Sequence, residues 1–254
     1  MTHRITFVHA PEIRYDQNYG TLFSPLWAYT LAAHVPEGWD VAIIDTIVES
    51  ADAIEAAGAD RVLTMDLHSP QIQGFFRIPV DHLYARHTLC DRVREMEIPD
   101  LVVCSPDTGF AKDAVDYARV LDVPAVFGCK QRTSHDERAE VLEVVGDVEG
   151  RNVLLVDDFT ITGGSLISVA ELLKERGARE IYAAVSHGVF SAGAAERIGS
   201  SLITRMLITD TIETASEPLP ENVEVVTVAP LFAAAIRSVH ERSSVSQLFP
   251  EPRL

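Results

Sequence analysis

The stretch from Val156 to Ser165 combines acidic, hydroxyl and glycine residues in an order that suits a sugar phosphate. An apolar strand is expected to deliver Asp157 and Asp158 to its end, and a turn rich in threonine, glycine and serine then opens a helix. Glycines let a backbone approach a ligand closely, and the free N–H groups of a helix N-terminus attract phosphate. The two carboxylates can accept hydrogen bonds from ribose hydroxyls or hold water on Mg²⁺. A capped turn with two solvated acids is the structural alternative, which the coincidence of strand, acid pair and glycine turn disfavours.

Four further side chains could take part in chemistry, and each has a structural alternative. His68 stands at the expected end of a strand and could be satisfied by backbone groups. Asp107 follows Ser-Pro and could cap a helix. Lys130 and Arg132 border a polar stretch and could be solvated loop charges. His187, at another strand end, is expected to have a structural role.

The elements that must position these residues alternate between strands and helices. Strands are expected over residues 5–10, 40–46, 61–66, 100–105, 125–130, 152–157, 181–187, 202–210 and 223–228. Helices are expected over residues 24–35, 51–57, 111–121, 164–176, 193–198 and 230–242. This alternation predicts a doubly wound parallel sheet, whose ligands bind at the carboxyl ends of the strands. A domain boundary is expected near residues 85–100.

Composition limits the function classes that the chain can belong to. The 254 residues are 47% hydrophobic and carry a formal net charge of −17. This charge disfavours unspecific binding to nucleic acid or to an anionic membrane, so a phosphorylated ligand requires local positive potential. No apolar run reaches the roughly 20 residues that cross a bilayer, and the N-terminus lacks signal-peptide features, so a cytoplasmic location is expected. The cysteines at positions 90, 104 and 129 show no CxxC spacing and are expected to be reduced thiols.

The stretch around Asp157 resembles the phosphoribosyl pyrophosphate-binding loop of phosphoribosyltransferases and of ribose-phosphate pyrophosphokinases. Four other segments are similar to the second family and follow its order along the chain. They are Asp66–Phe76 with its continuation to Asp81, Ser105–Asp107, Gly146–Val148 and Ser186–Ser191. The resemblance covers about residues 50–250 and implies an α/β fold of two phosphoribosyltransferase-like (Rossmann-like) domains with parallel sheets, the N-terminal one abridged. The implied domains are residues 1–90 and 91–254, with the segment Ser243–Phe249 packing back on the first.

The same resemblance implies an activity, namely transfer of pyrophosphate from MgATP to ribose 5-phosphate, which gives phosphoribosyl pyrophosphate and AMP. His68 would ligate the Mg²⁺ of MgATP with Asp66 in its neighbourhood, and Asp107 would help to bind a metal or the ribose. Lys130 and Arg132 would stabilise the transferring phosphoryl groups from a mobile catalytic loop. Homo-oligomers built from dimers, often hexamers, are implied as well. The implied substrate-binding residues are Asp157, Asp158, Thr160, Thr162, Gly163, Gly164 and Ser165.

The chain departs from the pattern of this family in two places. Ile161 stands where the family commonly has an acidic residue in the sugar-phosphate loop. Residues 1–48 do not resemble the family, and the sequence contains neither of the two segments, of Phe-Ser-Asp-Gly-Glu and Arg-Gln-Asp-Arg type, that bind ATP there. Two alternatives therefore stay open beside the pyrophosphokinase. One is an inactive or regulatory relative that binds ribose 5-phosphate or phosphoribosyl pyrophosphate, and the other is a phosphoribosyltransferase.

Overall fold

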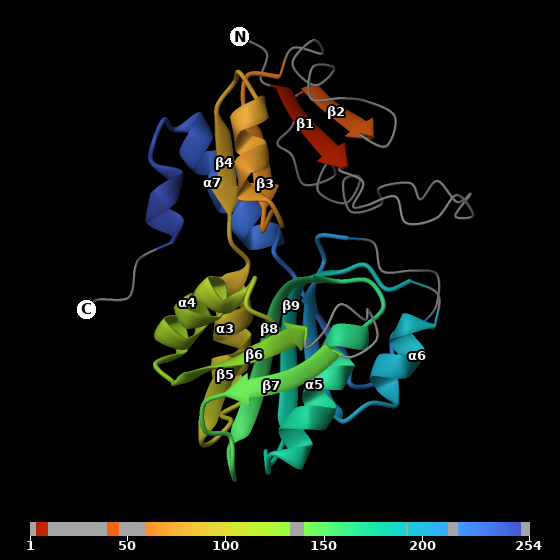
Figure 1. Ribbon diagram of the computed structural model, residues 1–254. Coiled ribbons are helices and arrows are strands. Elements are labelled where there is room, and N and C mark those ends of the chain that lie inside the picture. The colour runs from red at the N-terminus through yellow and green to blue at the C-terminus, as the bar shows by residue number, and fades with distance from the viewer. Residues whose placement is uncertain are drawn as a thin grey trace. The chain divides into compact units, whose positions relative to one another are not determined.

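Two short strand pairs and one larger sheet carry the β-structure of the described residues (Figure 1). The computed structural model describes residues 4–9, 40–45, 59–132, 140–191, 193–212 and 218–249. The chain divides into two units, residues 1–83 and residues 84–254. The helices predicted over residues 24–35 and 51–57 lie outside the described residues. No helix in the described part of the chain is both long and apolar enough to cross a bilayer.

The first unit contains two pairs of parallel strands. The pair β1 (Arg4–His9) and β2 (Asp40–Asp45) confirms the two strands predicted there. The third predicted strand is β3 (Val62–Met65), which pairs with β4 (Val80–Leu83). A 3₁₀ helix, η1 (Pro70–Phe75), lies between them in the chain. The sequence does not predict β4, because four residues are too short a pattern to distinguish a strand from a loop.

The second unit is built on a seven-stranded sheet in the order β11-β10-β9-β8-β5-β6-β7. Neighbouring strands are parallel except β6 and β7, which are antiparallel. The expectation of a wholly parallel sheet is wrong at this edge. Only residues 133–139 separate β6 from β7, too few for the crossover that a parallel pair needs. The strands are β5 (Leu101–Ser105), β6 (Ala125–Arg132), β7 (Glu140–Val145), β8 (Asn152–Thr160), β9 (Ile181–Gly188), β10 (Ile203–Thr209) and β11 (Val223–Val226).

Helices cover both faces of this sheet. They are α3 (Arg86–Glu95), α4 (Ala111–Leu121), α5 (Gly164–Glu175) and α6 (Ala194–Gly199). Helix α7 (Ala229–His240) instead contacts the 3₁₀ helix η2 (Val245–Leu248) that follows it. The helices α3 and α4 contact each other and pack on β5, β8, β10 and β11, whereas α5 packs on β7 and β9. The predicted bounds of α4 are confirmed, and those of α5, α6 and α7 agree within two residues. The sequence does not predict α3, because its buried residues Leu89, Cys90 and Val93 are too few to set a helical period.

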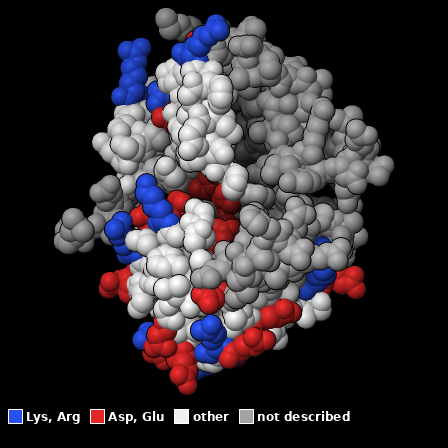
Figure 2. All heavy atoms as spheres, viewed as in Figure 1, with Lys and Arg blue, Asp and Glu red and all other residues white. Residues whose placement is uncertain are grey.

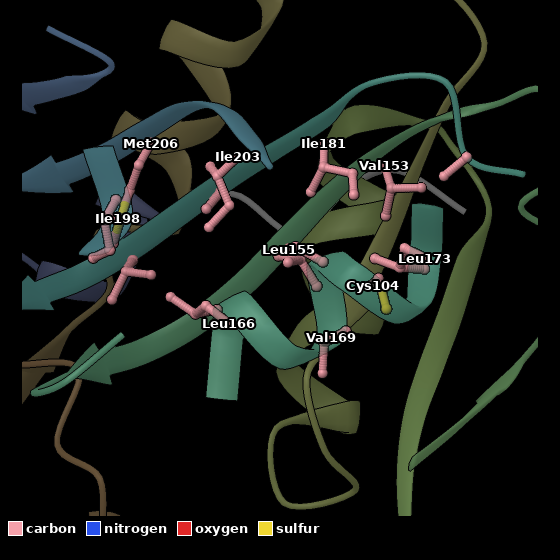
Figure 3. Packing of buried hydrophobic residues seen from close by; sticks show 14 of the residues in the cluster. Cys104, Val153, Leu155, Leu166, Val169, Leu173, Ile181, Ile198, Ile203 and Met206 are labelled. Atoms are coloured by element: carbon pink, nitrogen blue, oxygen red, sulfur yellow. The ribbon is translucent and has the colours of Figure 1, made fainter. Parts of the chain in front are cut away.

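A buried apolar cluster between the sheet and the helices α5 and α6 holds β8 in place (Figure 3). Val153 and Leu155 of β8 pack in it together with Leu166 of α5. Leu154 and Val156 are equally buried, and they face the other side of the sheet because side chains alternate along a strand. Coverage on both faces explains the nearly continuous apolar run of β8. Since the strand is fixed on both sides, the residues after Val156 are held at a defined place.

Candidate functional site

The acid pair Asp157 and Asp158 lies inside β8 rather than after it. The strand was expected to end at Asp157, but it continues to Thr160, which pairs with Gly188 of β9. Acidic and hydroxyl residues lower the apolar signal of a strand, so the sequence pattern stops too early. The β9 backbone supplies the hydrogen bonds that extend the strand. Sheet pairing therefore holds the backbone of both acids.

The carboxyl ends of β5 and β8 meet where the order of the strands in the sheet reverses. β5 ends at Ser105 and is followed by Pro106 and Asp107, while its neighbour β8 carries Asp157 and Asp158 near its end. In open parallel sheets, ligands bind in the crevice outside such a reversal. The sheet thus brings Asp107 close to the acid pair, although the two segments are far apart in the sequence.

The three carboxylates interact electrostatically. Burial, and after it the negative charges of Asp158 and Asp107, raise the pKa of the Asp157 carboxyl to about 8. Asp158 is only 8% exposed, and its Oδ1 accepts a hydrogen bond from the N–H of Phe159 at 2.9 Å. A bound cation, or hydroxyl groups that donate hydrogen bonds, would relieve this concentration of negative charge. The cluster is therefore suited to a polyhydroxylated or metal-bound ligand.

Asp107 also has a structural task. Its Oδ1 accepts hydrogen bonds from the N–H groups of Gly109 at 2.8 Å and Phe110 at 3.3 Å, just before α4 begins. Oδ1 of Asp107 thus caps the turn before α4, which is the structural role that the sequence also allowed. Gly128 of β6 runs directly against the same turn, because a Cβ at that position would lie 2.5 Å from the carbonyl oxygen of Pro106. Sequence reasoning missed Gly128, since the close approach joins segments that are not adjacent in the chain.

The turn between β8 and α5 is built from hydrogen bonds between its own residues. Gly163 adopts the left-handed conformation, with φ at +74°, and is the N-cap of α5. Its N–H donates to Oγ1 of Thr160 at 3.2 Å, and the N–H of Gly164 donates to Oγ1 of Thr162, also at 3.2 Å. These hydrogen bonds join four of the five residues of the turn that are predicted to bind the substrate, all except Ser165.

The first turn of α5 offers backbone donors to a ligand. The helical hydrogen bonds begin with the N–H of Ile167, which donates to the carbonyl of Gly163 at 2.9 Å. The N–H groups of Ser165 and Leu166 precede this bond and have no acceptor within the helix. Two free amides at the positive end of a helix favour an anion such as phosphate.

The segment that follows β9 supports this loop from one side. The N–H of Val189 donates to the carbonyl of Thr160 at 3.0 Å, and the N–H of Ser191 donates to the carbonyl of Ile161 at 2.7 Å. These bonds come from the Ser186–Ser191 motif of the sequence. Its role in this fold is therefore to fix the loop that follows β8.

Helix α6 completes the support. Arg197 donates from Nε and Nη2 to the carbonyl oxygen of Thr162, at 3.3 and 3.0 Å. A Cβ on Gly163 would lie 2.9 Å from Cγ1 of Ile198, so α6 packs directly against the glycine. Sequence reasoning missed Arg197, because an arginine on a short helix carries no signal of the carbonyl that it meets.

Asp66 and His68 follow β3 in the first unit. Asp66 has φ at +39°, and its N–H donates to the carbonyl of Leu83 at 3.0 Å. The N–H of Leu67 donates to Nε2 of His82 at 2.9 Å, so the backbone is anchored to β4 immediately before His68. His68 itself is exposed.

The predicted metal-binding residues are divided between the two units. Asp66 and His68 belong to the first, and Asp107 belongs to the second. Within the described residues, no three His, Cys, Asp or Glu side chains form a group that could hold a metal ion. Asp81, which closes the motif that begins at Asp66, forms a bidentate ion pair with Arg61. Asp81 therefore has a structural partner inside its own unit.

The predicted catalytic residues Lys130 and Arg132 lie at the end of β6. They pair with Leu142 and Glu140 of the antiparallel strand β7. Their side chains, and residues 133–139 between the strands, lie outside the described residues. The backbone places both residues on the strand that neighbours β5, which ends at the Asp107 turn.

Two other expectations agree with the structure. His187 is buried at 7% exposure, and its Nδ1 is hydrogen-bonded to Oγ1 of Thr211 at 2.7 Å, so it supports the end of β9. The three cysteines are free thiols. Burial raises the pKa of Cys90 and of Cys104 to about 12, which leaves both as unreactive thiols.

The fold and this site define an α/β protein whose mainly parallel sheet carries an acid pair and a glycine loop at the carboxyl end of β8. Residues 132–250 match the family model described as "Phosphoribosyl synthetase-associated domain". The chain is 45% identical over 200 residues to a ribose-phosphate pyrophosphokinase of Chlorobaculum tepidum, covering 78% of this chain and 61% of that protein. The corresponding protein of Caldanaerobacter subterraneus is 48% identical, with 78% of this chain and 63% of that protein covered. The chain thus spans about three fifths of the length of these relatives.

A solved structure agrees with these sequence relatives. The crystal structure of phosphoribosylpyrophosphate synthetase from Mycobacterium smegmatis matches with a TM-score of 0.70 and 32% identity. The match covers 85% of this chain and 77% of that one. The chain belongs to the ribose-phosphate pyrophosphokinase family.

Proposed function

We propose that the chain transfers a diphosphoryl group from MgATP to ribose 5-phosphate. The 1-hydroxyl oxygen of the ribose attacks the β-phosphorus of ATP, the bond from that phosphorus to the α,β-bridging oxygen breaks, and AMP leaves. The product is phosphoribosyl pyrophosphate. The observation that carries this proposal is the loop Thr160–Ser165, which opens α5 directly beyond Asp157 and Asp158.

In this proposal the 5-phosphate lies at the N-terminus of α5. The backbone N–H groups of Ser165 and Leu166 donate to its oxygens, and the helix dipole adds positive potential. The hydroxyls of Thr162 and Ser165 each have one proton to donate. Asp157 and Asp158 accept hydrogen bonds from the ribose hydroxyls, which orients the sugar so that its 1-hydroxyl faces the nucleotide.

The residues of the site fit a magnesium ion that arrives with the nucleotide. Mg²⁺ keeps several waters and usually takes one or two carboxylates together with substrate phosphates, so a protein cage of three or more side chains is not needed. The electrostatic repulsion between Asp157 and Asp107 supports binding of a cation nearby. Within the first unit, His68 would ligate the ion of MgATP, with Asp66 in its neighbourhood. Within the second unit, Asp107 would help to bind a metal or the ribose. When bound, the magnesium ion neutralises phosphate charge and orients the group that is transferred.

The transfer needs positioning and charge neutralisation more than a strong base. Lys130 and Arg132 would stabilise the negative charge on the transferring phosphoryl groups. Their place on β6, beside the strand that leads to Asp107, supports this role. Arginine offers a planar fork that matches phosphate oxygens, whereas lysine acts as a point charge.

We also expect the domain organisation and assembly that the family implies, with domains 1–90 and 91–254 in homo-oligomers built from dimers, often hexamers. The ring of Phe249 lies 5.7 Å from that of Tyr84 and 6.0 Å from that of His87. These ring contacts support the expectation that the segment Ser243–Phe249 packs against residues that precede position 90.

One observation favours a second function. Ile161 gives the sugar-phosphate loop an apolar side chain at the position where an acid is common, which removes one polar contact from the site. A relative that binds ribose 5-phosphate without converting it is therefore the alternative.

Formation of AMP from MgATP, measured with and without ribose 5-phosphate, tests the proposal. We expect AMP formation that depends on ribose 5-phosphate, that His68→Ala abolishes and that the control His240→Ala, at the end of α7, retains. Absence of AMP from folded protein that still binds ribose 5-phosphate would contradict the pyrophosphokinase and leave the binding relative. Release of pyrophosphate from phosphoribosyl pyrophosphate with a nucleobase acceptor would instead identify a phosphoribosyltransferase.

A further inference from the structure

The peptide bond between Thr162 and Gly163 is held at both ends by hydrogen bonds. Its carbonyl oxygen accepts from Nε and Nη2 of Arg197, at 3.3 and 3.0 Å. Its N–H donates to Oγ1 of Thr160 at 3.2 Å. The C=O and N–H of a trans peptide point in opposite directions, so the two contacts fix one orientation together. The planar guanidinium adds directional rigidity, since its donors have a fixed geometry.

This peptide determines which groups the loop presents to an anion. It leads into Gly163, whose left-handed φ of +74° starts α5, and the amides of Ser165 and Leu166 follow at once. If the peptide rotated, the carbonyl of Thr162 would leave Arg197 and could turn its negative end toward a bound phosphate. The contact with Arg197 therefore keeps an acceptor out of a site that needs donors.

Arg197 also contributes a positive charge to an acidic protein. The formal net charge of the chain is −17, and acidic and basic side chains are interspersed on the lower part of the face seen in Figure 2. No broad basic surface is visible there that could attract a sugar phosphate. A single cation that contacts the loop itself is thus an efficient source of local positive potential.

We propose that Arg197 is a positioning residue of the sugar-phosphate loop, because it holds the Thr162 carbonyl away from the ligand and so directs the first amides of α5 to the 5-phosphate. This inference rests on the proposed function, which makes ribose 5-phosphate the ligand of the loop. The structural alternative is a residue that only ties α6 to the loop. Such a residue would change stability and leave affinity unaltered.

Calorimetric titration of the full chain with ribose 5-phosphate tests this role. The variants are Arg197→Met, which removes charge and donors, and Arg197→Lys and Arg197→Gln, which each keep a donor group. Arg176→Met is the matched control, since Arg176 is exposed at the opposite end of α5. We expect Kd to rise about tenfold in Arg197→Met, less in the Lys and Gln variants, and less than twofold in the control. Circular dichroism melting verifies that each variant is folded.

Unchanged affinity of folded Arg197→Met would overturn the inference. Equal losses in Arg197→Met and Arg176→Met would overturn it as well, because loss of charge alone would then explain both. Failure of the unsubstituted chain to bind ribose 5-phosphate would count against the proposed function instead. In that case the same proteins are titrated with inorganic phosphate. A weaker affinity for phosphate in Arg197→Met than in Arg176→Met would then support the positioning role, and equal affinities would contradict it.

Discussion

The imidazole of His82 accepts a hydrogen bond at Nε2 from the backbone N–H of Leu67, at 2.9 Å, and thereby anchors the chain one residue before His68. The bond joins β4 to the segment that follows β3. Because Nε2 accepts, this nitrogen must be unprotonated in the structure. His82, which directly follows the motif Asp66–Asp81, thus supports the backbone on which His68 stands.

Substitution His82→Leu should impair the site more than substitutions that keep an acceptor. The N–H of Leu67, which is partly buried, would lose its partner, at a cost of at most about 1–3 kcal/mol, the range for a buried donor. We expect His82→Leu to lower both stability to urea and AMP formation, and His82→Gln or His82→Asn to retain most of both. A leucine variant that matches the unsubstituted chain in both measurements would show that the bond is dispensable.

Gly163→Ala should destabilise the protein and weaken binding of ribose 5-phosphate. The substitution places a Cβ at a φ of +74° and within 2.9 Å of Cγ1 of Ile198. The backbone strain alone costs about 1–2 kcal/mol, and the packing conflict adds to it. Gly150→Ala is the matched control, since φ is +68° there and no atom lies within 4 Å of the new Cβ. Chemical denaturation and titration should show a loss of affinity at position 163 only; equal behaviour of both variants would contradict the packing argument.

Gly128→Ala should disturb the turn that carries Asp107. The new Cβ would lie 2.5 Å from the carbonyl oxygen of Pro106, and a backbone atom cannot rotate out of the way as a side chain can. We expect a loss of about 1–3 kcal/mol in the free energy of unfolding, together with weaker binding of ligands at the carboxyl end of β5. Gly74→Ala serves as a control, because nothing lies within 4 Å of its Cβ. Urea denaturation of both variants checks the prediction, which fails if they are equally stable.

The raised pKa of Asp157 predicts how stability depends on pH. The pKa rises from 3.8 to about 8 on folding, so between these values the folded state holds a proton that the unfolded state releases. The stabilising contribution of this carboxyl to the free energy of unfolding is therefore fully present below about pH 4, and it is lost as the pH rises toward about 8. Asp157→Asn cannot titrate, and we expect its Tm to exceed that of the unsubstituted chain increasingly over this range, in buffer without divalent metal.

The control for this experiment is Glu175→Gln, which alters an exposed carboxylate at the end of α5. Its Tm should follow that of the unsubstituted chain. The Tm of Asp157→Asn is compared with that of the unsubstituted chain at about pH 4 and at about pH 8. An equal difference at both pH values would refute the assigned pKa shift. Addition of MgATP and ribose 5-phosphate should reduce the advantage of the variant, because the ligands use the charged form.

Several features of this site could be predicted from local sequence because their physical causes are local. The bounds of α4 follow from its apolar period and short flanking turns, and the loop at Gly163 follows from a glycine turn after an apolar strand. The length of β8 could not be predicted in this way. Its last residues are polar, and only pairing with β9 makes them part of the strand.

The sequence by itself determined the α/β class, most of the alternating elements and the loop with its acid pair, because apolar periodicity, glycine and hydroxyl spacing act between neighbours in the chain. Only the tertiary structure decided that Asp107 lies near Asp157, that β7 runs antiparallel and that Arg197 meets the carbonyl of Thr162. These relationships depend on how strands are ordered in the sheet and on which helix packs beside which loop. Such contacts form between residues distant in the chain, and no local pattern of residue types encodes them.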